Sequence, residues 1–65
     1  MAERDPELIR VKVAAEMLGV SIRVIYDLIR SGRLPAYNLG TEDSPSFRLD
    51  VDEVRAFLRS SRVSA

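Results

Sequence analysis

The sequence predicts an α+β fold that is mostly α: two short helices joined by a tight turn, a two-stranded β-hairpin and a third helix. Apolar residues recur at helical spacing on both sides of a turn at residues 19–21, the pattern changes after Gly32, and an aspartate begins the last apolar segment. With 65 residues, the chain is expected to form one small domain. We expect a flexible N-terminal arm over residues 1–7, the domain over 8–62 and a tail over 63–65.

A first helix is predicted over residues 11–18. The apolar residues of one face follow the spacing i, i+3, i+4 and i+7: Val11, Ala14, Ala15 and Leu18. The paired alanines are small enough to let a second helix approach closely. Gly19 suits a left-handed C-cap, Val20 is expected to be buried in the turn, and Ser21 is expected to cap the next helix.

A second helix is predicted from Ile22 to about Ser31, where Gly32 ends it. The residues expected to face inward are Ile25, Leu28 and Ile29, with Ile22 and Tyr26 at the edges. The residues expected on the outward arc are Arg23, Asp27 and Arg30, flanked by Val24. Two short helices joined by a tight turn form a helix-turn-helix, in which the second helix protrudes from the domain.

The segment after Gly32 predicts a β-hairpin with a long tip. Residues 34–39 are interpreted as an edge strand, 40–46 as the turn, and 47–49 as the second strand. Asp50 and Glu53 form a capping box for a third helix that runs to about Arg62. The residues that this helix is expected to bury are Val51, Val54, Phe57 and Leu58.

The sequence contains no cysteine and no histidine. It therefore lacks thiolate nucleophiles, disulfides and the side chain that titrates near neutral pH. We expect a protein that is not an enzyme and that has no cofactor and no metal site. The longest apolar runs are three residues, far below the roughly 20 needed to span a bilayer, so we expect no membrane partner and a cytoplasmic location.

Ten basic and ten acidic residues cancel, but they are not evenly distributed. Residues 10–33 hold five basic residues against two acids, and residues 54–65 hold three arginines and no acid. Between these basic blocks, residues 34–53 hold five acids against one arginine. The segregation of charge is typical of proteins with a charged partner, despite the zero net charge.

Three segments resemble a known family: VKVAAEMLGVS at residues 11–21, IYDLIRSGRLPA at 25–36 and FRLDxxEV at 47–54. Together they resemble the excisionase-type branch of the MerR-like winged helix-turn-helix proteins, which are recombination directionality factors. The resemblance covers roughly residues 9–58. It implies a winged helix-turn-helix fold and sequence-specific binding to double-stranded DNA. It also implies binding near a phage or prophage attachment site, where such proteins direct a tyrosine-family integrase toward excision.

The exposed start of the second helix supplies the candidate base contacts. Arg23 is the strongest candidate, because its guanidinium matches guanine O6 and N7; the alternative is a solvated surface arginine. Val24 is a candidate for a thymine methyl group, or it fills a gap beside the hairpin. Asp27 is a candidate acceptor for cytosine N4, although pairing with Arg23 or Arg30 along the helix is the favoured interpretation.

Other residues are candidates for the phosphate backbone. These are Lys12, Tyr26, Arg30 and Arg33; Ser21, the cap of the second helix, is a DNA-binding candidate as well. Tyr26 could instead lie mostly in the core. Arg48, beside the hairpin, is a candidate for a narrow minor groove, or it pairs with an acid across the hairpin.

Self-association on DNA is a further hypothesis. Arg55, Arg59 and Arg62 are expected to form a ridge of three unpaired arginines along the third helix. The hairpin tip carries Glu42 and Asp43, which phosphates would repel. Docking of this tip on the ridge of a neighbouring copy would produce a head-to-tail array. Two other functions remain open: a small transcriptional regulator of the same fold, and a protein-interaction module that has lost DNA binding.

Overall fold

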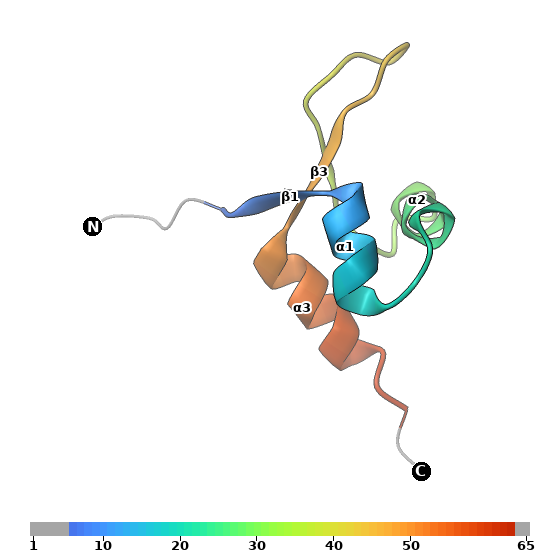
Figure 1. The fold of residues 1–65 in the computed structure, drawn as a ribbon, viewed down its shortest axis with the longest axis vertical. Helices are drawn as coiled ribbons and strands as arrows, with labels where there is room; N and C mark the ends of the chain where they lie inside the picture. Colours follow the sequence, from blue (N-terminus) through green and yellow to red (C-terminus); the bar gives the residue numbers. More distant parts are fainter. Residues whose placement is uncertain (1–5, 64–65) are drawn as a thin grey trace, which may run out of the picture.

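A computed structural model describes residues 6–63, and this part of the chain folds as a winged helix-turn-helix (Figure 1). The elements in chain order are β1 (Leu8–Arg10), α1 (Val11–Leu18), α2 (Ile22–Arg30), β2 (Tyr37–Asn38), β3 (Phe47–Asp50) and α3 (Val51–Ser60). Figure 1 shows α1 between α2 and α3, while the β2–β3 hairpin, the wing, extends away from all three helices. The wing and α2 therefore project from the same small helical core.

The turn between α1 and α2 is fixed by Gly19, as predicted. Gly19 adopts a left-handed conformation with φ 68°. Its amide donates to the Glu16 carbonyl at 3.3 Å, and the Val20 amide donates to the Ala15 carbonyl at 3.0 Å. This pair of bonds is the Schellman arrangement, which needs a residue that tolerates positive φ. The prediction that Val20 is buried is wrong: it is 38% exposed, because the turn lies at the surface.

Close packing of α1 on α2 depends on small side chains, as expected. Ala14 and Ala15 are buried, and Ile25 of α2 is fully buried beside them in the same cluster. Leu28 and Ile29 are half-buried on the inward face of α2, whereas Ile22 at its edge is 45% exposed. The outward arc of α2 is thus left free of the core.

The second helix ends at the predicted glycine. Gly32 has φ 78°, its amide donates to the Ile29 carbonyl at 3.1 Å, and the Arg33 amide donates to Leu28 at 3.0 Å. The Leu34 amide also donates to the Leu28 carbonyl, at 3.2 Å, and its side chain is buried. Leu34 therefore belongs to the turn that follows α2 and not to a strand. Pro35 has no amide proton to donate to a neighbouring strand. The strand predicted over residues 34–39 is therefore shortened to Tyr37–Asn38.

The predicted two-stranded hairpin is part of a three-stranded antiparallel sheet in the order β1-β3-β2. The additional strand, β1, pairs Ile9 with Leu49, and Leu49 is fully buried. Sequence pattern did not indicate β1, because three residues are too few to show an alternation of apolar and polar positions. Most of the predicted flexible arm lies outside the described residues, but the Glu7 carbonyl accepts a bond of 2.9 Å from the Val51 amide.

Asp50 begins α3, as predicted, but not through a capping box. Its carboxylate accepts from the Asp52 amide at 2.8 Å, and within residues 6–63 the Glu53 side chain makes no return bond to Asp50. The helix ends at Ser60, two residues before the predicted end, where the Ser60 and Ser61 hydroxyls both donate to the Phe57 carbonyl.

The prediction that Leu58 is buried is wrong. Val51 and Val54 of α3 are buried and Phe57 is half-buried, but Leu58 is 53% exposed. Helix α3 therefore contacts the core through a single narrow stripe of apolar side chains. The buried cluster consists of Val11, Ala14, Ala15, Ile25, Leu34, Leu49 and Val54.

Candidate nucleic-acid interface

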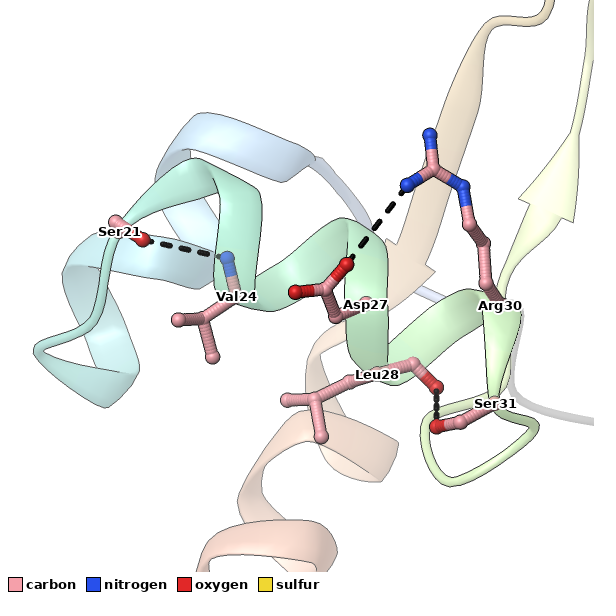
Figure 2. Close-up of polar contacts among 6 residues, drawn as sticks. All are labelled: Ser21, Val24, Asp27, Leu28, Arg30 and Ser31. Carbon is pink, nitrogen blue, oxygen red and sulfur yellow. Dashed lines mark hydrogen bonds and ion pairs between the residues drawn. The ribbon is translucent and has the colours of Figure 1, made fainter.

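The start of α2 is an exposed and well-defined helix terminus. The Ser21 hydroxyl caps it by accepting from the Val24 amide at 3.2 Å, as Figure 2 shows. A capped terminus holds the first turn in helical geometry instead of fraying. Arg23 and Val24, which the sequence analysis proposed for base contacts, both lie on this first turn and are exposed. The first turn is the part of such a helix that reaches deepest into a major groove.

Asp27 and Arg30 pair along the outward arc of α2. Their charged groups lie 3.8 Å apart, and both side chains are more than half exposed (Figure 2). This agrees with the favoured interpretation of Asp27 as a partner within the helix. An exposed pair of this kind contributes less than about 1 kcal/mol, so a phosphate can compete for Arg30. The Arg30 guanidinium also lies 5.8 Å from the centre of the Tyr26 ring.

Arg23 differs from Arg30 because it has no partner among the described residues. Within residues 6–63, Arg23 forms no ion pair and no side-chain hydrogen bond. Its guanidinium is therefore not occupied by a competing carboxylate. With respect to the described part of the chain, the outward arc thus offers one unpaired arginine at its start and one loosely paired arginine near its end.

A second group of candidates lies beside α2 at the base of the wing. Lys12, Tyr26 and Arg48 line one cleft, although they come from α1, α2 and β3. The Tyr26 ring packs edge-on against Phe47 with ring centres 6.0 Å apart, so Tyr26 is half in the core and half at the surface. The structure thus brings together three residues that are far apart in the sequence.

Arg48 is held in place by the start of β3. One of its terminal nitrogens donates to the Ser46 hydroxyl at 3.0 Å and to the Phe47 carbonyl at 2.9 Å. The interpretation of Arg48 as the partner of a hairpin acid is wrong, because its cross-strand neighbours are Arg10 and Tyr37. Arg10 itself was missed as a candidate; the only signal was its poor suitability as an N-cap of α1.

Arg33 does not join the other candidates. Its guanidinium lies 5.7 Å from the centre of the Phe57 ring of α3. It lines a separate cleft of about 300 Å³ that also contains Pro35 and Glu53. The side chain is directed toward α3, so it covers apolar surface there instead of extending the outward arc of α2.

The wing tip and the third helix carry the charges proposed for self-association. Glu42 and Asp43 are exposed at the tip, and Arg59 is exposed on the last turn of α3. Two details of the predicted ridge are wrong. Arg55 is paired with Asp52 at 3.7 Å because the two are one helical turn apart, and Arg62 lies beyond the end of α3. Among residues 6–63, Arg59 is the ridge residue that is both helical and without an ion pair.

Residues 6–63 contain no group of three or more Asp or Glu side chains arranged to hold a metal ion. No helix in this part is long and apolar enough to cross a membrane.

The exposed α2, the glycine turn before it and the wing beside it define a winged helix-turn-helix DNA-binding domain. Comparison with family models agrees: residues 8–62 match the model described as a helix-turn-helix domain, so the chain belongs to the helix-turn-helix domain family. No curated protein and no solved structure matches the chain significantly.

Proposed function

We propose that this protein is a non-catalytic, excisionase-like architectural factor that binds duplex DNA and directs a tyrosine-family integrase toward excision. The observation that carries the DNA-binding part is the capped start of α2, which presents Arg23 and Val24 away from the core. The excision role is supported by the sequence resemblance over residues 11–54.

Base recognition is assigned to the first turn of α2. Arg23, unpaired within the described residues, donates to guanine O6 and N7 in the major groove. Val24 contacts a thymine methyl group. Removing a bidentate arginine contact relaxes discrimination at that base pair by about 1–3 kcal/mol.

Contacts to the phosphate backbone of the DNA supply most of the binding affinity. Lys12 and Tyr26 line the cleft at the start of α2, Arg30 lies at its end, and all three reach phosphates on either side of the groove. Each neutralised phosphate contributes a slope of about −0.9 in a plot of log affinity against log salt concentration. Affinity is therefore expected to fall steeply as salt is raised.

A domain of this size reads only a few base pairs, so specificity requires several copies or adjacent proteins. We propose that the wing tip of one copy, with Glu42 and Asp43, docks near Arg59 of the next. Charge reversal by Glu42→Lys and Asp43→Lys is expected to abolish cooperativity in a gel-shift titration, while Arg59→Glu in the same double variant restores it. Unchanged cooperativity in the wing variant contradicts this contact.

DNA binding is tested by fluorescence anisotropy with random duplex DNA at low salt. Wild-type protein is expected to bind at micromolar concentration; no binding favours a protein-interaction module. Arg23→Ala is then compared with Arg55→Ala, a control whose arginine is exposed on α3 and already paired with Asp52. A larger loss for Arg23→Ala on its specific site than on random DNA supports base reading.

The excision role has its own test. Integrase-mediated excision in vitro is measured with and without the protein, on DNA that carries the attachment sites. Stimulation of excision is the expected result. Binding to DNA without stimulation favours a transcriptional regulator of the same fold.

A further inference from the structure

A cleft of about 290 Å³ lies where the start of α1, the start of α2 and the base of the wing meet. Three cations line it, from three different elements: Arg10 ends β1, Lys12 lies in α1, and Arg48 lies in β3. None of the described residues that line the cleft is acidic. The three positive charges are therefore not neutralised by any acidic residue in the lining.

The sheet register brings two of these cations onto one face. Arg10 of β1 is directly opposite Arg48 of β3, so both side chains project from the same side of the sheet. Like charges in directly opposed positions are destabilising. Arg48 is held by its bonds to the Ser46 hydroxyl and the Phe47 carbonyl, which keep its guanidinium at the cleft.

The remaining lining groups suit an anion with several acceptor oxygens. The cleft is bordered by Tyr26 and Ser46, whose hydroxyls can donate hydrogen bonds. Guanidinium groups match the geometry of a phosphate, and a lysine adds a compact positive charge. The lining thus combines positive charge with hydrogen-bond donors, the two features by which proteins bind phosphate.

We infer that this cleft binds one phosphate group and that, in the DNA complex, the group is a backbone phosphodiester held between α1 and the wing. The inference rests on the proposed DNA binding and adds Arg10 to the interface. The phosphate relieves the repulsion between Arg10 and Arg48. It also fixes the wing relative to α1, because Lys12 comes from α1 and Arg48 from β3 of the wing.

The DNA arm of the test compares Arg10→Gln, Lys12→Gln and the double variant on a duplex of about one helical turn, which holds one copy. Arg55→Gln, which changes an exposed arginine of α3 that pairs with Asp52, is the matched control. Each cleft variant is expected to reduce the salt slope by up to about 0.9, and the double variant by the same total, because one phosphate is shared. A double variant that loses about twice this amount, or cleft variants that match the control, overturn the inference.

The second arm uses inorganic phosphate and needs no DNA. The thermal midpoint is measured in phosphate and in chloride at matched ionic strength. Wild-type protein is expected to gain stability in phosphate, and Arg10→Gln is expected to lose this gain while being no less stable than wild type in chloride. Stabilisation by phosphate combined with an unchanged DNA slope assigns the cleft to a free phosphoryl ligand and contradicts the backbone assignment. Failure of wild-type protein to bind DNA contradicts the proposed function, whereas DNA binding by wild-type protein together with cleft variants that behave like wild type in both arms contradicts only the cleft.

Discussion

In the helix-turn-helix, α1 and α2 pack through buried apolar side chains, whereas the wing tip is organised by hydrogen bonds among exposed polar groups. Ala14, Ala15 and Ile25 are buried at the junction of the two helices. Every residue from Leu39 to Pro45 is exposed. The position of α2 therefore depends on burial, while the shape of the wing tip depends on local contacts that can change without unfolding the core.

Asn38 is the centre of the wing tip. Its side-chain oxygen accepts from the Gly40 amide at 2.9 Å and from the Ser46 amide at 3.0 Å, so it joins the two sides of the loop. The Leu39 amide donates to the Ser46 carbonyl at 2.9 Å, and the Ser44 amide donates to the Thr41 hydroxyl at 2.9 Å. A few short polar contacts thus define a loop that has no apolar core of its own.

The largest expected effect comes from the core. Ile25→Ala removes a fully buried side chain from α2 and is expected to lower the free energy of unfolding by about 2–5 kcal/mol. Urea or thermal unfolding measures the loss. Val24→Ala, on the exposed arc of the same helix, is the control and should change stability by no more than about 0.5 kcal/mol. Equal losses in the two variants contradict the assignment of Ile25 to the core.

Gly40→Ala tests the wing tip. A Cβ at this position would overlap the Ser44 carbonyl oxygen and lie 2.9 Å from the Ser46 nitrogen, both of them backbone atoms. Overpacking of this kind costs about 1–3 kcal/mol. We expect amide hydrogen exchange to rise for Leu39, Thr41 and Ser46 while exchange of Ile25 stays slow. Faster exchange throughout the molecule would show that the wing and the helix-turn-helix unfold together.

Ser21→Ala removes the cap of α2. The expected loss of stability is about 1 kcal/mol, because the Val24 amide loses its acceptor. Ser21→Thr retains a hydroxyl acceptor without adding charge and is the matched control. Since the affected turn carries Arg23, we also expect weaker DNA binding for Ser21→Ala than for the control, measured by anisotropy. Identical unfolding midpoints for the two variants argue against a capping role.

Asn38→Ala gives the smallest expected effect on stability, no more than about 1 kcal/mol, because the bonds that it removes are exposed to water. Asn38→Asp keeps the acceptor oxygen and loses only the donor to the Thr41 carbonyl. Nuclear magnetic resonance shifts should change at the wing tip in the alanine variant and remain near wild type in α1 and α2. Shifts that spread into the helices contradict the separation of the two regions.

Local chemistry determined the helices of this protein. Gly19 and Gly32 ended α1 and α2 at the predicted positions because only a residue that tolerates positive φ closes these turns, and Ser21 capped α2 as expected. Apolar spacing also identified most of the core, including Ile25 and Val54. These features depend on neighbours within a few residues, so the sequence carries them directly.

The tertiary structure alone decided the features that join distant segments. The strand β1 forms because it pairs with β3, and the Val51 amide at the start of α3 bonds to the Glu7 carbonyl just before it. This pairing places Arg10 opposite Arg48, although the two are far apart in the sequence. The same packing turns Arg33 toward Phe57 and leaves Leu58 in solvent. Register and side-chain direction follow from how the elements pack, and no local pattern encodes them. The sequence therefore determined the exposed helix, and the fold determined which cations stand beside it.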